Sequence, residues 1–209
     1  MRLNKETFPL VVEGIPFIIP PAVITVIAGV WGKVYLFLPF LALTVFVCSF
    51  FRNPRRRITD GAGLILSPAD GKIVAVKKEQ KGAMVSIFMS VFNCHVNRAP
   101  AAGTIQEIRY QRGQFLPANK EEASRQNEQN SLQLQTAKGQ KVRFVQVAGI
   151  IARRIVCYVR KGDPVRQGEI VGAILFGSRV DVLLPKGIAI KVREGERVKG
   201  GKSILGVIQ

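Results

Sequence analysis

The sequence predicts a mainly β domain over residues 58–209. Residues 1–57, which precede it, are predicted to form an apolar helical hairpin that ends in a basic segment. Three observations predict this fold class. Between Phe8 and Phe51 only two residues are charged. After Thr59, short β-branched runs alternate with Gly and Pro turns, which is typical of β domains. The chain of 209 residues is 47% hydrophobic, which suits a buried core and is too apolar for a disordered chain.

Two apolar runs make up the predicted hairpin, Ile15–Trp31 and Val34–Phe51. Each is about 17–18 residues long, which is the lower limit for a helix that spans a bilayer. The first run contains three prolines, so we expect its helix to begin near Pro21. The runs therefore predict a membrane hairpin that spans the bilayer or re-enters it, with a buried core hairpin as the alternative.

Basic residues flank the hairpin at both ends. Arg2 and Lys5 precede it and a basic cluster from Arg52 to Arg57 follows it, whereas the turn carries only Lys33. Cytoplasmic flanks of membrane segments are enriched in Lys and Arg, so both ends of the hairpin are expected in the cytoplasm. The predicted location is the cell membrane, with the β domain on the cytoplasmic side.

The net charge of +17 indicates a polyanionic partner. Residues 58–209 are basic in their own right. Nucleic acid would explain this charge, but no helix-turn-helix, zinc-finger or aromatic–basic RNA motif is visible. A basic domain beside a bilayer is attracted to anionic headgroups by about 1 kcal/mol per Lys or Arg. We therefore expect an anionic membrane surface, and no nucleic acid, as the partner.

The expected strands of the β domain are the β-branched runs that lie between turn residues. They are Lys72–Val76, Met84–Met89, Gly103–Tyr110, Lys141–Val147, Ala152–Val159, Ile188–Val192 and Ser203–Ile208. The segment Ala118–Gln129 is rich in Glu, Gln and Asn. We expect it to be a helix or an exposed loop, which could close over a site as a lid.

Two weak internal repeats run through the β domain. Val159–Gly168 resembles Val192–Gly201, and Pro68–Ile73 resembles Pro100–Ile105. Paired hairpins of this kind resemble the barrel-sandwich hybrid of biotinyl and lipoyl domains. A carrier domain of that kind would need an acceptor lysine at a hairpin tip, and Lys186 is the nearest candidate.

Cysteine and histidine are too few for a metal centre. Cys48, Cys94 and Cys157 are odd in number and widely spaced, which excludes a disulfide-stapled domain and a Cys-x-x-Cys knuckle. His95 is the single histidine of the chain. We therefore expect no metal ion, and acid–base chemistry is limited to one imidazole.

Ser178, His95 and Asp70 are the candidate catalytic residues. They are the residue types of an activated hydroxyl, in which serine is the nucleophile, histidine the base, and aspartate the group that orients the imidazole. Each also has a structural alternative, since a lone histidine often serves packing and an aspartate before a glycine suits a turn. Their separation in the sequence neither supports nor forbids their meeting in space.

Five motifs occur in an order that resembles the short form of the phosphatidylserine decarboxylase family, which are pyruvoyl-dependent membrane enzymes. These motifs are Ser67-Pro-Ala-Asp-Gly71, Cys94-His-Val-Asn-Arg-Ala-Pro100, Asn127-Glu128, Ala148-Gly-Ile-Ile-Ala-Arg-Arg154 and Phe176-Gly-Ser-Arg-Val-Asp181. The resemblance covers nearly the whole chain, including the apolar hairpin and its Phe50-Phe-Arg-Asn-Pro54 exit.

The resemblance implies a proenzyme that cleaves itself between Gly177 and Ser178. Ser178 Oγ would attack the carbonyl of Gly177, with His95 as the base and Asp70 holding the imidazole in the right tautomer. Gly177 suits this step because it tolerates a strained backbone. β-Elimination of the resulting ester would leave a dehydroalanine at position 178. This residue would take up water and lose ammonia to become a pyruvoyl group, the covalent cofactor.

The resemblance also implies the turnover chemistry. The pyruvoyl group would form a Schiff base with the amine of phosphatidylserine and act as the electron sink when CO₂ leaves, which yields phosphatidylethanolamine. His95 would donate the proton that completes this step. The α chain, residues 178–209, would stay bound to the β chain, residues 1–177, as a heterodimer because so short a piece cannot fold alone.

One position departs from the family pattern. Longer bacterial members have two histidines in the segment that matches residues 94–100, and Arg98 occupies the second position here. A division of roles between two histidines is therefore not carried over. Arg98, Arg153, Arg154 and Arg179 are candidate ligands of the lipid phosphate or carboxylate, and the alternative is a basic face toward anionic lipid.

The sequence leaves two other classes of function open. One is a non-enzymatic, membrane-tethered β domain that binds anionic lipid or an envelope partner. The other is a carrier or efflux-adaptor-like protein with similar hairpins. The substrate of a decarboxylase could be phosphatidylserine or an archaeal ether-lipid analogue, and the oligomeric state is open.

Overall fold

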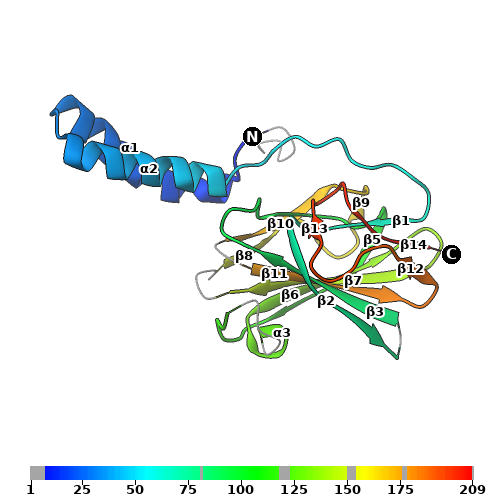
Figure 1. Cartoon of the computed structure of the whole chain (residues 1–209). Coiled ribbons are helices and arrows are strands. Elements are labelled where there is room, and N and C mark those ends of the chain that lie inside the picture. Colours follow the sequence, from blue (N-terminus) through cyan, green and yellow to red (C-terminus); the bar gives the residue numbers. More distant parts are fainter. Residues whose placement is uncertain (1–7, 81, 118–122, 150–153, 176–177, 209) are drawn as a thin grey trace. The chain divides into compact units, whose positions relative to one another are not determined.

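The structure is a computed structural model, and it describes residues 8–80, 82–117, 123–149, 154–175 and 178–208 (Figure 1). The chain divides into two compact units, Met1–Arg55 and Arg56–Gln209. The described part of the first unit is largely helical, and that of the second consists mainly of strands. The predicted fold class, a mainly β domain with an N-terminal helical hairpin, is confirmed.

The first helix is longer than the sequence predicts. The elements of this unit are a 3-10 turn η1, Val12–Gly14, and the helices α1, Ile15–Val30, and α2, Val34–Phe50. The expectation that the first helix begins near Pro21 is wrong, because α1 runs through Pro20 and Pro21. Pro16 lies in the first turn, where no backbone N–H is needed. Each internal proline removes one helical hydrogen bond, which apolar membrane-type helices tolerate.

One stretch of this unit, Val12–Val30, is long and apolar enough to cross a membrane, with a mean hydropathy of 1.8. The two helices contact each other through Thr25 and Thr44, whose hydroxyls lie 3.3 Å apart. Gly29 lets them approach closely, because a Cβ there would lie 3.3 Å from the Phe37 ring. The hairpin is therefore a packed pair of helices with a polar contact between them.

Asn53 ties the two ends of the hairpin together. Its backbone N–H donates to the Pro9 carbonyl at 2.7 Å, and its Nδ2 donates to the Phe8 carbonyl at 3.0 Å. The N–H of Val11 donates to the Phe51 carbonyl at 2.8 Å. These bonds give a structural reason for the asparagine of the exit motif, and they hold the entry and exit of the hairpin side by side.

The described residues of the β unit form three antiparallel sheets. Figure 1 shows the arrangement of their strands. The largest is a curled sheet of eight strands in the order β13-β2-β3-β11-β7-β6-β5-β9, and the smaller ones are β1-β14-β12 and β4-β10-β8. The strands are β1 Leu64–Leu66, β2 Gly71–Glu79, β3 Gly82–Met89, β4 Val96–Arg98, β5 Gly103–Gln111, β6 Gln129–Gln135, β7 Lys141–Ala148, β8 Arg154–Cys157, β9 Pro164–Val165, β10 Ile170–Leu175, β11 Ser178–Pro185, β12 Ile188–Ile190, β13 Arg197–Val198 and β14 Ile204–Ile208.

The hydrophobic core lies between these sheets. Side chains from β2, β3, β7, β10 and β11 meet there, with Ile73, Ile87, Phe144, Ile174 and Val182 all fully buried. A smaller cluster on the other face of the large sheet joins Ala123 of helix α3, Ala123–Gln126, to residues of β7. The likeness to biotinyl and lipoyl domains stays a prediction.

The strands predicted at β2, β3, β5, β7, β12 and β14 are confirmed. The predicted strand Ala152–Val159 begins outside the described residues, and β8 occupies Arg154–Cys157. The expected lid segment contains α3 and the start of β6, while residues 118–122 lie outside the described residues. Strand β11 was missed because Arg179 and Asp181 interrupt its apolar pattern, and both turn out to be buried.

Equivalent residues of the internal repeats make equivalent backbone contacts. Gly168 and Gly201 have φ of +75° and +73°, a region in which glycine is favoured. The N–H of Gly168 donates to Ala99, and that of Gly201 donates to Ser67, at 2.9 and 2.8 Å. The Ile58 side chain packs against both glycines. The repeats thus form two equivalent corners of the β unit, next to the Asp70 and Arg98 segments.

Candidate active site

Ser178 is the first residue of β11, which lies between β3 and β7 in the eight-stranded sheet. It pairs with Met89, the last residue of β3, and with Ala148, the last residue of β7. Its side chain is fully buried, and its Oγ donates to Met89 Sδ at 3.3 Å. A thioether is a weak acceptor, so this contact leaves the hydroxyl available as a nucleophile.

Three buried amides extend from this point across the core. Asn97 Nδ2 also donates to Met89 Sδ, at 3.8 Å, and Asn97 Oδ1 accepts from Gln146 Nε2 at 2.8 Å. Gln146 Oε1 accepts in turn from Asn130 Nδ2 at 2.9 Å. Sequence reasoning missed these residues, although a fully buried glutamine inside the β-branched run of β7 is a detectable signal.

His95 precedes β4 directly and is buried. Its carbonyl accepts from the N–H of Ile174, which anchors His95 to β10. The ring nitrogen Nδ1 lies 2.9 Å from the carbonyl oxygen of Asn93. A carbonyl only accepts hydrogen bonds, so Nδ1 carries the proton and Nε2 is the basic nitrogen of the neutral imidazole.

Asp70 makes its hydrogen bonds at a different corner. Its two carboxylate oxygens accept from Arg56 at 2.5 and 2.6 Å, and Oδ1 also accepts from the N–H of Gly200 at 2.8 Å. Arg56 also donates to the Gly200 carbonyl. The contact that fixes the His95 tautomer in this structure is therefore the carbonyl of Asn93, and the orienting role of Asp70 stays a prediction.

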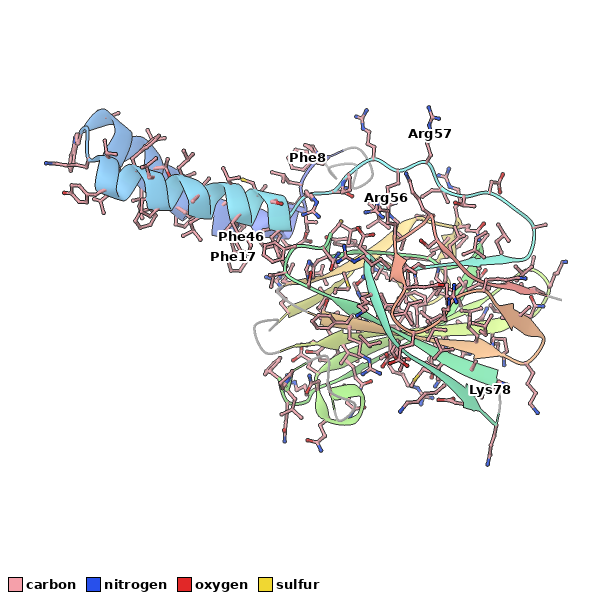
Figure 2. The ribbon with its side chains drawn as sticks, in the orientation of Figure 1. Phe8, Phe17, Phe46, Arg56, Arg57 and Lys78 are labelled. Atoms are coloured by element: carbon pink, nitrogen blue, oxygen red, sulfur yellow. The ribbon has the colours of Figure 1, made fainter. Side chains whose placement is uncertain are left out.

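The ion pair between Arg56 and Asp70 is nearly buried, with the side chains 10% and 14% exposed. Burial opposes the charge of Arg56, but the hydrogen bond and the charge of Asp70 outweigh it and raise the pKa of the guanidinium. Figure 2 shows Arg56 turned toward the β unit, whereas Arg57 points away from it. The segment before β1 is thus fixed to the corner that holds Asp70.

The candidate arginines are not brought together in one cluster of the described residues. Arg98 is buried and donates to the Gly168 carbonyl at 2.9 Å. Arg179 is buried and donates to Asp181 Oδ1 at 2.6 Å, and to Ser86 Oγ at 2.8 Å. Arg154 is exposed on β8. Two further predicted residues, Arg153 and Gly177, lie outside the described residues.

Asn127 explains one of the quoted motifs. It is fully buried, and its Nδ2 donates to the carbonyls of Ala148 and Leu116 at 2.7 and 2.8 Å. The N–H of Leu116 donates back to its Oδ1. Because Ala148 pairs with Ser178, Asn127 holds the strand that borders the candidate nucleophile.

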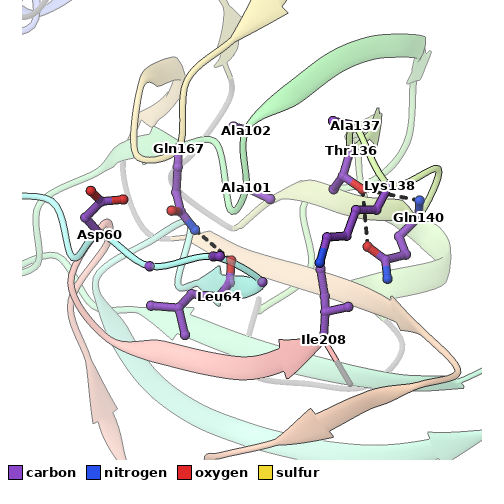
Figure 3. A pocket seen from close by; sticks show the side chains of 13 residues that line it. Asp60, Leu64, Ala101, Ala102, Thr136, Ala137, Lys138, Gln140, Gln167 and Ile208 are labelled. Atoms are coloured by element: carbon purple, nitrogen blue, oxygen red, sulfur yellow. Dashed lines mark hydrogen bonds between the residues drawn. The ribbon is translucent and has the colours of Figure 1, made fainter.

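A cavity of about 440 Å³ lies elsewhere in the β unit (Figure 3). It is lined by the Asp60–Leu64 segment, by Ala101 and Ala102, and by the turn between β6 and β7. Gln167 crosses its edge and donates to the Leu64 carbonyl at 2.7 Å. That turn and Ser178 lie at opposite ends of β7, about 24 Å apart at a rise of about 3.4 Å per residue. The cavity is therefore separate from the candidate active site.

Known proteins resemble this chain over most of its length. The family model described as phosphatidylserine decarboxylase matches residues 43–206. The phosphatidylserine decarboxylase proenzyme of Syntrophus aciditrophicus is 46% identical over 202 residues, which cover 93% of this chain and 95% of the relative. The proenzyme of the same name from Geotalea uraniireducens is 43% identical over 211 residues, covering 98% and 99%. That from Burkholderia pseudomallei is 45% identical over 199 residues, covering 92% of each. The chain belongs to the phosphatidylserine decarboxylase family.

Proposed function

We propose that this chain is a phosphatidylserine decarboxylase proenzyme that cleaves itself between Gly177 and Ser178. The observation that carries the proposal is the position of Ser178 in a chain of this family. Its hydroxyl is buried at the start of a central strand, where its hydrogen bond within the described residues goes to a weak acceptor. A buried serine without a strong hydrogen bond is costly for a core and useful as a nucleophile.

His95 is the proposed base of the cleavage. The Asn93 carbonyl holds its Nδ1 proton, so Nε2 can take the proton of Ser178 Oγ as the hydroxyl attacks Gly177. The bond from the Gly177 carbonyl carbon to Oγ forms and its bond to the Ser178 nitrogen breaks, while His95 returns the proton to that nitrogen. The product is an ester with a free Ser178 amine. Asp70 is proposed to support the same step.

The architecture supports a cleaved chain that stays together. Residues 178–209 supply β11, which pairs with β3 on one side and with β7 on the other. They also supply β14, which lies between β1 and β12. An α chain that begins at Ser178 is therefore hydrogen-bonded to the β chain along several strands, and we propose that the two remain a heterodimer.

The Ser178 site fits a pyruvoyl cofactor, since the group would be made from the atoms of Ser178 in a fully buried position. Met89 Sδ there contacts both the Ser178 hydroxyl and the Asn97 amide. Such a group supplies a ketone that condenses with the amine of phosphatidylserine and accepts electrons as CO₂ leaves. We propose that His95 donates a proton to the product, phosphatidylethanolamine. Exposed Arg154 is suited to the lipid headgroup, whereas Arg98 and Arg179 already hold protein groups.

The cleavage proposal predicts two chains in the purified protein. Mass spectrometry should find residues 1–177 with a free carboxylate, and residues 178–209 with a blocked N-terminus. Phosphatidylserine in mixed micelles should lose CO₂ and give phosphatidylethanolamine. A chain that stays intact and still binds anionic vesicles would instead indicate a non-enzymatic lipid-binding domain, and would overturn the proposal.

We propose that the helical unit inserts into the cell membrane and that the β unit lies on the cytoplasmic side. Apolar side chains on both helices are exposed, among them Val26 at 64% and Val45 at 60%. The chain should stay in the membrane pellet after an alkaline carbonate wash, and a V26K/V45K double variant should be released. Release of the unchanged chain by salt alone would show that charge, and not insertion, holds it.

A further inference from the structure

The buried amides next to Ser178 have a fixed direction. A thioether accepts hydrogen bonds and cannot donate strongly, so the end of the Asn97 amide that faces Met89 Sδ is its NH₂ group. Asn97 Oδ1 then needs a donor, which is Gln146 Nε2, and Gln146 Oε1 needs one from Asn130 Nδ2. The chain of amides therefore delivers an N–H donor to the sulfur that Ser178 Oγ also contacts.

Burying these three amides in a hydrophobic core is energetically unfavourable. Asn97 and Gln146 are fully buried, and Asn130 is 3% exposed. A buried polar group that is left without a partner destabilises the fold, because it has lost its hydrogen bonds to water. Gly172 on β10 leaves room for this arrangement, since a Cβ there would lie 2.9 Å from Gln146 Nε2. Apolar side chains would fill the same space more simply, so the amides point to a task at Ser178.

Resting on the proposed self-cleavage, we propose that Asn97 donates a hydrogen bond to Ser178 Oγ during the elimination step, and that Gln146 and Asn130 position its amide. After the acyl shift, Oγ is the ester oxygen between the Gly177 carbonyl and Ser178 Cβ. A base removes the Cα proton of Ser178, the Cβ–Oγ bond breaks, and a Cα=Cβ double bond forms. Oγ leaves with the bonding electrons as part of the Gly177 carboxylate.

Negative charge therefore builds on Oγ as the bond breaks. A buried N–H that turns from Met89 Sδ to Oγ would stabilise this charge, and losing one donor of this kind lowers the rate by about 10²–10³. In the acyl shift, by contrast, a bond to Oγ forms and the negative charge collects on the Gly177 carbonyl oxygen. A defect in Asn97 should accordingly slow the elimination and let the ester accumulate.

The variant Gln146→Glu tests the direction of the hydrogen bonds that link Asn130, Gln146 and Asn97. Glutamate has the same size and still accepts from Asn130, but its carboxylate offers no donor to Asn97 Oδ1. The Asn97 amide should then turn its NH₂ toward the glutamate and its oxygen toward Ser178. We expect the α chain to form about 10²-fold more slowly. The accumulated ester should be cleaved by hydroxylamine, giving an α chain with a free serine N-terminus.

The pH dependence separates this role from a packing defect. Protonation of the introduced carboxylate gives an O–H that can again donate to Asn97 Oδ1. Cleavage of Gln146→Glu should therefore recover as the pH falls, relative to the unchanged chain at the same pH. The matched control is Gln133→Glu, since Gln133 lies on β6 where it accepts from Arg143 at an exposed contact. It should be processed normally at every pH.

The outcomes distinguish the two proposals. If the unchanged chain is not cleaved before Ser178, the proposed function fails and the role of Asn97 fails with it. If that chain is cleaved and folded Gln146→Glu is cleaved equally fast without ester, only the role of Asn97 is wrong. If Gln146→Glu does not fold, Asn97→Asp decides, because it keeps an acceptor for Gln146 and removes the Nδ2 donor. Normal processing of that variant at neutral pH would equally overturn the role of Asn97.

Discussion

The chain with Ser178→Ala is expected to remain intact and to have no detectable decarboxylase activity. Alanine has no oxygen to attack the Gly177 carbonyl, so neither the ester nor the cofactor can form. Loss of one hydroxyl whose hydrogen bond goes to Met89 Sδ should leave the fold in place, with a melting temperature close to that of the unchanged chain. Intact mass and CO₂ release from labelled phosphatidylserine measure the two effects.

A second serine provides the control for Ser178. Ser203 also lies in residues 178–209, and its Oγ accepts from the N–H of Lys199 at 2.9 Å. Ser203→Ala should therefore be cleaved and active, with a small loss of stability. Decarboxylation by an uncleaved Ser178→Ala chain would contradict the assignment of the cofactor to this position.

Replacing His95 with alanine is expected to slow cleavage by about 10²–10⁴-fold, the range for loss of a general base. His95 is the single histidine of the chain, so no second imidazole can substitute for it. The time course of α-chain formation after synthesis in a cell-free system measures the rate. Efficient processing of His95→Ala would remove His95 from the cleavage step.

Asp70→Asn completes this test, because the two possible roles of Asp70 affect different measurements. If Asp70 also orients His95, cleavage of the folded variant should slow, in addition to the stability lost with the Arg56 contact. If it serves mainly to hold Arg56, the variant should lose about 3 kcal/mol of stability, as expected when a buried ion pair is broken, and should be cleaved at a similar rate. The bidentate contact with Arg56 favours the second result.

Much of the fold follows from patterns that are local in the sequence. The apolar runs and their basic flanks predict the helical hairpin, and β-branched runs between turns predict strands such as β2, β3 and β7. Strand β11, which the sequence patterns do not predict, depends on contacts made in the folded sheet. In β11, Arg179 is acceptable inside the sheet only because Asp181 and Ser86 meet its guanidinium there.

The candidate site, like the fold, is only partly predictable from the sequence. Ser178, His95 and Asp70 can be selected from the sequence, because few residue types perform this chemistry and their motifs resemble one family. The residues that form hydrogen bonds with them cannot be predicted from the sequence. The sequence places the Asn93 carbonyl only two residues from His95, but nothing local shows that it accepts the Nδ1 proton, or that Arg56 engages Asp70.

The class of this protein can be read from its residues: an apolar hairpin, a basic β domain, and a serine in a family motif. What surrounds that serine depends on how the strands pack. Ser178 contacts Met89 of β3 and Asn97 contacts Gln146 of β7, although these pairs are 89 and 49 residues apart in the sequence. Hydrogen bonds act over about 3 Å, so their partners are set by the packing of strands and not by sequence spacing.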